Sequence, residues 1–327
     1  MTLLVITIAV ALAFDFTNGF HDTVNAIATS VSTRAMSPRV AVLISAAANL
    51  AGAFLTTAVA KTVGKGIIDT HLANEKTILA ALIGAITWNV ITWWLGLPSS
   101  SSHALIGGLV GAALVQSGEK GVQWHGIVHK VVFPALFSPA IGFFGALLIL
   151  LGIYWIFFRV PPGAANRTFR HGQVLSAIWV SFNHGANDAQ KTMGVIALAL
   201  YESGHISTFY IPTWVIVASA VSMGLGTYFG GWRIIRTLGQ RIFNIDPPSG
   251  FAAQLAGGGA RYLATSLGYP VSTTHVVSGA VMGAGATKRL SAVRWGVAGN
   301  ILIAWLLTIP AAACVAAIIW FPVKAIF

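Results

Sequence analysis

A motif of proline, hydroxyl residues and histidine occurs twice in this sequence, and it limits the possible folds more than any other feature. The copies lie at residues 98–111 and 270–283. Each runs from proline through consecutive Ser or Thr residues to a histidine, with two glycines at the same later positions. Proline and hydroxyls before an apolar segment are typical of a helix N-terminus, whose free backbone N–H groups attract anions. The pattern therefore predicts two matching helix starts that point at one place.

An acidic motif is duplicated as well. Phe, Gly and Asp recur at the same spacing within residues 16–26 and 182–194. The offset between these copies differs by only a few residues from that of the hydroxyl motifs, a difference that a surface loop can absorb. We predict two homologous halves, residues 1–160 and 173–327, joined by a cytoplasmic linker at 161–172. Each half contains one acidic and one hydroxyl motif.

The composition indicates an integral membrane protein. Hydrophobic residues make up 56% of the 327 residues and charged residues 8%, whereas soluble domains carry about 25% charge. The formal net charge of +11 does not indicate a nucleic-acid partner, because the basic residues fall mainly in short loops, where they mark membrane topology. We therefore expect an all-α, multi-pass protein of the cytoplasmic membrane, surrounded by the lipid bilayer.

Eight apolar runs are long enough to cross a bilayer, which takes about 20 residues. They occupy roughly residues 2–33, 37–60, 77–97, 126–158, 173–200, 211–232, 250–269 and 290–321. The segments 102–117 and 274–286 are shorter and glycine-rich, and each directly follows a hydroxyl motif. Irregular backbone at membrane depth is tolerated only where it is buried in protein or lines a cavity. We predict that each segment is the second arm of a re-entrant helical hairpin.

Loop charges predict opposite orientations for the two halves. The turn at Arg34 and Arg39 has no acid and should be cytoplasmic, whereas its counterpart at 201–210 holds Glu202 and no Lys or Arg. Loop 61–76 mixes both signs, whereas its counterpart carries three arginines against one acid. Inverted repeats are typical of secondary transporters, which bind substrate near the midplane between the repeats.

The hydroxyl motifs are the candidate anion site. Two copies with proline and histidine in register favour an anion held between opposed helix N-termini. The alternative is that the hydroxyls only join helices and the glycines only allow close packing. The candidate substrate ligands in these motifs are Ser100, Ser101, Ser102, Ser272, Thr273 and Thr274.

Two aspartates are candidate coupling residues, because an acid at the centre of a membrane span costs on the order of 2.5–3.5 kcal/mol. Asp22 and Asn25 are three residues apart and share a helical face, which suits cation coordination or a proton relay. Asp188 occupies the matching position in the second half; the alternative is that each aspartate caps a broken helix. His184 lies four residues before Asp188, but we predict no metal and no cofactor, because no further His, Cys or acid gathers nearby in the sequence.

Both motifs closely resemble the inorganic phosphate transporter (PiT) family. Residues 185–188 (GAND) and 270–275 (PVSTTH) match its duplicated G-x-N-D and P-x-S-T-T-H signatures, and residues 188–194 are similar to its bacterial branch. The likeness extends over essentially the whole chain. It implies secondary transport of inorganic phosphate, driven by a proton or sodium gradient, with phosphate held between the hairpin tips.

The resemblance also implies roles for individual residues. Asn187 and Lys191 join the candidate phosphate ligands, and the residues expected to serve cation or proton coupling are Asp22, Asn25 and Asp188.

Some residues depart from the sodium-coupled members of that family. Leu55 and Gln254 stand where those relatives carry glutamates, and Lys191 stands opposite Asn25, where an exact repeat would have asparagine. The changes remove cation ligands or, at Lys191, add a positive charge. We therefore predict proton symport by alternating access, in which Lys191 neutralises Asp188 or helps to hold the anion.

Other functions stay open at this point. A sulfate or other oxyanion permease would share the scaffold, and sodium could replace the proton. A midplane anion site with coupled acids disfavours an ion channel. We predict that the protein is not an enzyme, because it has no Gly-x-Ser-x-Gly or His-Glu-x-x-His element. Its aromatic-rich segments could be membrane interface belts or the contact of a homodimer.

Overall fold

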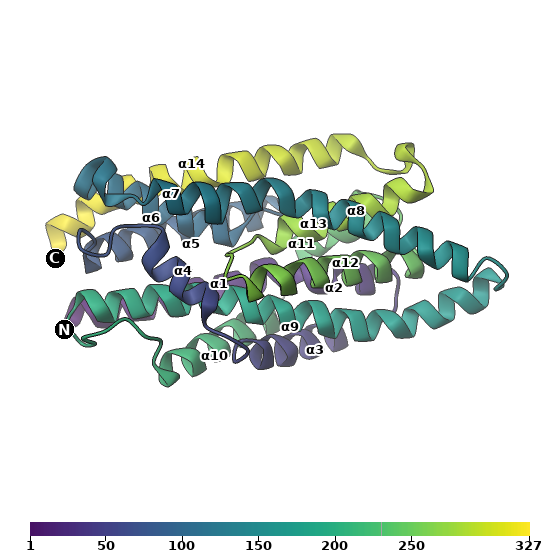
Figure 1. Ribbon diagram of the computed structural model, residues 1–327, viewed down its shortest axis with the longest axis horizontal. Coiled ribbons are helices and arrows are strands. Elements are labelled where there is room, and N and C mark those ends of the chain that lie inside the picture. Colours follow the sequence, from purple (N-terminus) through teal and green to yellow (C-terminus); the bar gives the residue numbers. More distant parts are fainter. Residues whose placement is uncertain (230) are drawn as a thin grey trace.

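The computed structural model describes residues 1–229 and 231–327, which form a bundle of helices (Figure 1). Within this part of the chain the only β-type pairing is an isolated bridge between Ile68 and Val122. The α-helices are α1 (Thr2–Asp22), α2 (Val24–Ser32), α3 (Pro38–Gly52), α4 (Ala58–Gly66), α5 (Glu75–Leu95), α6 (Ser101–Ser117), α7 (Trp124–Ile127), α8 (Phe133–Ile156), α9 (Pro162–Glu202), α10 (Thr213–Phe229), α11 (Trp232–Arg236), α12 (Pro247–Ser266), α13 (Thr273–Lys288) and α14 (Trp295–Ile326).

Four continuous helical stretches in the described residues are long and apolar enough to cross a membrane: Thr2–Ser32, Glu75–Leu95, Trp124–Ile156 and Trp295–Ile326. They coincide with four of the predicted runs. Three other runs coincide with α9, α10 and α12, which are shorter or carry more polar side chains. Residue 230, near the end of the predicted run 211–232, lies outside the described residues.

The predicted run 37–60 is not one helix. It divides into α3, which ends at Gly52, and α4, which begins at Ala58. A buried glutamine of α9 stabilises the start of α4, because the Gln190 Oε1 atom accepts from the backbone N–H groups of Val59 (2.8 Å) and Ala60 (3.2 Å). A side-chain acceptor at these positions satisfies N–H groups that a new helix start leaves free.

The predicted linker at 161–172 is helical. These residues are the first turns of α9, a single helix from Pro162 to Glu202. Pro162 lies in the first turn, where its missing N–H is no loss, and no other proline follows before the helix ends.

Each short helix that follows a hydroxyl motif packs against the last helix of the other half. In α6, a Cβ on Gly111 would overlap the carbonyl of Ala313 in α14. In α13, a Cβ on Gly283 would overlap the carbonyl of Phe143 in α8. The motif glycines therefore permit backbone-to-backbone contact at matching places, as small residues do in membrane helix packing.

Replacing Gly111 with alanine is expected to destabilise the protein by about 1–3 kcal/mol, as overpacking of a tight contact typically does. Gly299 in α14 provides the matched control, because its added Cβ would meet open space. Gly299→Ala should leave thermal unfolding in detergent unchanged or raise its midpoint slightly, through better helix propensity. Equal effects of the two substitutions would contradict the close contact.

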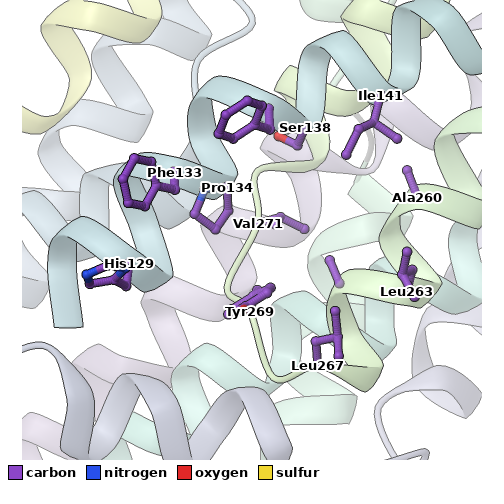
Figure 2. A pocket seen from close by; sticks show the side chains of 12 residues that line it. His129, Phe133, Pro134, Ser138, Ile141, Ala260, Leu263, Leu267, Tyr269 and Val271 are labelled. Carbon is purple, nitrogen blue, oxygen red and sulfur yellow. The ribbon is translucent and has the colours of Figure 1, made fainter. Parts of the chain in front are cut away.

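Two lateral cavities also occupy matching places in the two halves. One of about 500 Å³ lies between α8 and α12, and Figure 2 shows Tyr269 and Val271, on the connection to α13, between those helices. The other, of about 250 Å³, lies between α5 and α14. Their lining residues on α5 and α12 and just after these helices correspond by repeat position: Trp88 and Ala260, Thr92 and Ala264, Leu95 and Leu267, Leu97 and Tyr269. Both cavities are mainly apolar and lie beside the polar centre described next.

Candidate functional site

The two hydroxyl motifs meet at the start of α6 and α13. Ser100 caps α6 by accepting from the His103 N–H (3.2 Å), and Ser272 caps α13 by accepting from the His275 N–H (3.3 Å). The imidazole rings of these two histidines lie with their centroids 4.6 Å apart. The structure therefore brings both predicted helix starts together and shows that Ser100 and Ser272 are their helix caps.

The first acidic motif lies at a break between α1 and α2. The Asp22 Oδ1 atom lies 2.8 Å from His21 Nδ1 and accepts from the Thr274 hydroxyl at 3.4 Å. The Asn25 side-chain amide donates to the same hydroxyl at 3.0 Å. Asp22 and Asn25 are thus both engaged with the second hydroxyl motif, more than 240 residues away in the chain.

Asp188 lies in the unbroken middle of α9 and has four partners. Its Oδ2 atom accepts from the Thr273 hydroxyl (2.8 Å) and lies 2.9 Å from His184 Nε2. Its Oδ1 atom pairs with the Lys191 ammonium and lies 3.4 Å from the Arg261 guanidinium. Two cations therefore surround one buried carboxylate. A carboxylate at this depth requires such partners, because a buried charge without them is strongly destabilising.

Lys191 reaches beyond its own motif. Its ammonium also donates to the Ser102 hydroxyl of the first hydroxyl motif and to the Val271 carbonyl (3.4 Å). Asn25, at the matching position in the first half, makes the corresponding contact with Thr274. Each acidic motif thus holds a hydroxyl of the other half.

Arg261 is a central residue that the sequence motifs did not reveal. It lies in α12, is completely buried, and donates to the Thr273 hydroxyl and to the Asn183 carbonyl (3.4 Å). A signal was present, because Arg261 is a charged residue inside the apolar run 250–269, and such residues are functional candidates by default. Its repeat position matches Asn89 in α5, another buried polar residue.

The remaining predicted ligands behave differently from one another. Asn187 donates to the Thr265 hydroxyl (2.9 Å) and to the Tyr269 carbonyl (3.0 Å), so it supports the connection before α13 and contacts none of the motif hydroxyls. The Ser101 hydroxyl is buried and makes no hydrogen bond within the described residues. Of the predicted ligands, Ser101 therefore has the free hydroxyl.

The expectation that no further acid lies near His184 and Asp188 is wrong. Asp22 joins them, and each of the three residues offers a ligand atom within 4.8 Å of the others. The sequence could not reveal this, because the two acidic motifs meet only through the antiparallel packing of α1 and α9. A divalent cation here would be opposed by Lys191 and Arg261, which already neutralise Asp188.

The central cluster is electrically balanced and almost completely buried. Asp22, Asp188, Lys191 and Arg261 are each at most 1% exposed. With both carboxylates ionised, two negative charges face two positive charges. Any anion that binds among these four groups disturbs that balance unless protons or other cations bind with it.

Comparison with known proteins places these observations in a family. Residues 18–316 match the model of the phosphate transporter family (PHO4). A relative from Rhizobium meliloti described as a probable low-affinity inorganic phosphate transporter is 51% identical, covering 98% of this chain and 96% of that protein. A relative from Bacillus subtilis with the same description is 45% identical, covering 99% of both chains. A solved structure described as the sodium-dependent phosphate transporter matches with a TM-score of 0.85 and 29% identity, covering 100% of both chains.

Proposed function

This chain belongs to the phosphate transporter family, and we propose that it moves inorganic phosphate across the cell membrane as a proton symporter working by alternating access. The observation that carries the proposal is the competition for donors at the centre of the molecule. Asp188 pairs with Lys191 and Arg261 and accepts from Thr273, and these three are the donors best suited to an oxyanion. Phosphate can take these donors only when the carboxylate gives them up.

Protonation of the carboxylate would release the donors. A protonated Asp188 no longer attracts Lys191 and Arg261 strongly, and its O–H becomes a donor. The freed ammonium and guanidinium would then form charge-assisted hydrogen bonds with phosphate. A bound phosphate in turn favours the protonated carboxyl. This mutual stabilisation is the coupling, and it is reciprocal by thermodynamic necessity.

The charge balance supports the same conclusion. The cluster is neutral when both aspartates are ionised, so a singly charged phosphate calls for one proton and a doubly charged phosphate for two. Asp22 is the second acceptor, because it lies beside Asp188 and accepts from Thr274. Asn25 would help to hold the hydroxyl that Asp22 releases.

We assign the phosphate site to the region between the starts of α6 and α13. Ser101 supplies an unused hydroxyl, and the hydroxyls of Ser102, Thr273 and Thr274 become available when Lys191, Asp188 and Asp22 change partners. Ser100 and Ser272 act as helix caps that present the backbone N–H groups. Asn187 positions the segment before α13.

Two inverted repeats would switch the site between the two sides of the membrane. The proposal is supported by the course of two equivalent helices: α1 starts, and α9 ends, at the end of the molecule that carries both chain termini (Figure 1). It is also supported by the exchanged packing of α6 on α14 and α13 on α8. Rocking of one repeat against the other is the motion expected for this arrangement.

Sodium is the alternative coupling ion, favoured by the solved structure of a relative described as sodium-dependent. Gln254 supports the proton instead. Its neutral amide donates to the Ser30 hydroxyl (2.7 Å) and to the Ala26 carbonyl (3.0 Å). A glutamate carboxylate has no N–H to donate to that carbonyl, so the second contact would be lost.

We expect purified protein in liposomes to take up radiolabelled phosphate under an inward proton gradient without sodium, and excess sulfate should not compete. A protonophore should abolish the uptake, because it removes the driving force. A sodium gradient at equal pH on both sides should drive no accumulation. Strict dependence of uptake on sodium would show that sodium, and not the proton, is the coupling ion. Efficient competition by sulfate would overturn the choice of substrate.

A further inference from the structure

A buried carboxylate in α1 lies outside the cluster described above. Asp15 is 0% exposed, and neither of its carboxylate oxygens has a partner that meets hydrogen-bond geometry within the described residues. The polar side chains beside it are those of Asn18, one turn further along α1, and Thr192 in α9. The Thr192 hydroxyl also lacks a hydrogen-bond partner.

Asp15 is placed in line with the transport site. Residues 15, 18 and 22 follow the spacing of one helix face, so Asp15, Asn18 and Asp22 form a polar row along α1. Thr192 lies one turn beyond Asp188 on α9. The row therefore extends from the pair of aspartates toward the N-terminal end of α1.

The charged groups around Asp15 do not neutralise it. On α9 the nearby charges are Asp188 and Lys191, and Lys191 is already paired with Asp188. The charged residues of α5 are Glu75 and Lys76, in its first turn, and α10 has none. An ionised carboxylate in such a place is strongly disfavoured, and neutralisation is the usual outcome.

We propose that Asp15 is a third proton-carrying carboxyl of the transport cycle, loaded and unloaded together with the Asp22 and Asp188 pair. The inference rests on the proposed proton symport. While it is buried, as in this structure, Asp15 holds a proton as a neutral carboxyl. When the site opens to the lower proton concentration, its O–H bond breaks, the proton passes to water, and the carboxylate remains until the next proton binds.

The matching position in the second half of the chain carries no acid. The second-half counterpart of Asp15 is Ser181, whose hydroxyl is paired with the Ser45 hydroxyl at 2.8 Å. Only the first half therefore carries the additional acid. By the loop charges, this end of α1 faces the outside, from which an inward-moving proton would arrive.

The test is the steady-state accumulation of phosphate in proteoliposomes at a fixed pH gradient with the membrane potential held at zero. Each coupled proton contributes about tenfold accumulation for each unit of pH gradient. Asp15→Asn should therefore lower accumulation about tenfold per pH unit relative to the unmodified protein. The matched control Ser181→Ala should accumulate as much phosphate as the unmodified protein.

Accumulation by Asp15→Asn equal to that of the unmodified protein would overturn the proposal. A second readout holds even if Asp15→Asn transports nothing: the infrared band of a protonated carboxyl should be present in the unmodified protein at neutral pH and weaker in Asp15→Asn. An identical band in both proteins, or its loss on adding sodium, would also overturn the proposal. If the unmodified protein ignores a pH gradient, proton symport fails, and the infrared band still decides whether Asp15 carries a proton.

Discussion

Asp188→Asn is expected to reduce proton-driven phosphate uptake by more than about 100-fold while phosphate binding persists. The asparagine leaves Lys191 and Arg261 without their carboxylate. Separating one member from a buried ion pair costs about 3–5 kcal/mol, which corresponds to roughly 100-fold or more in an equilibrium constant. A bound phosphate would relieve that cost, so it should bind tightly and leave slowly. Transport then stops at release.

Uptake in proteoliposomes and phosphate binding to the purified variant together test this expectation. Asp246→Asn is the matched control, because Asp246 pairs with Lys288 at the surface, 2.7 Å away, with 36% of its side chain exposed. Exposed ion pairs contribute little to stability, and asparagine caps helices as well as aspartate does. Phosphate uptake by Asp246→Asn should therefore be unchanged. Loss of binding in Asp188→Asn, with the fold intact, would contradict the competition between carboxylate and phosphate.

The second large effect is expected at Arg261. Arg261→Met should weaken phosphate binding by about 30-fold or more, since truncating one partner of a buried charge pair costs about 2–5 kcal/mol. The remaining cluster would hold two carboxylates against Lys191 alone, and this net negative charge repels the anion. Arg261→Lys keeps the positive charge, so it should lose less phosphate affinity than Arg261→Met, although lysine cannot reproduce the guanidinium geometry.

A binding isotherm with radiolabelled phosphate, combined with thermal unfolding of each variant, separates loss of binding from loss of fold. Arg289→Gln serves as the control, because Arg289 is exposed at the end of α13. That variant should bind phosphate as the unmodified protein does. Equal weakening in Arg289→Gln and Arg261→Met would point to a general effect of protein charge and against a specific role for Arg261.

The duplicated motifs account for what could be predicted from sequence. Two copies of a short pattern identified the helix starts and the two aspartates, because each feature depends on local residue types. Asn25, Lys191 and Thr274 were recognised for the same reason. Their pairing across the halves, however, follows from how the helices pack.

The misses have a common physical cause. Arg261 and Asp15 lie inside runs that are apolar on average, so hydropathy over a window conceals them. Each is a charged residue in an apolar run, which was the available signal, and the structure shows that both are buried. The new helix start at Ala58 is capped by the side chain of Gln190, which lies more than 100 residues away. Long-range contacts of this kind leave no local signal in one sequence.

The most direct test of the central claim is the number of protons that the protein takes up when phosphate binds. Calorimetry of the purified protein at one pH, in two buffers of different ionisation enthalpy and without sodium, gives this number once the titration of phosphate itself is subtracted. Our account predicts net proton uptake by the unmodified protein and less by Asp188→Asn. Phosphate binding with no linked proton uptake, or binding that requires sodium, would contradict it.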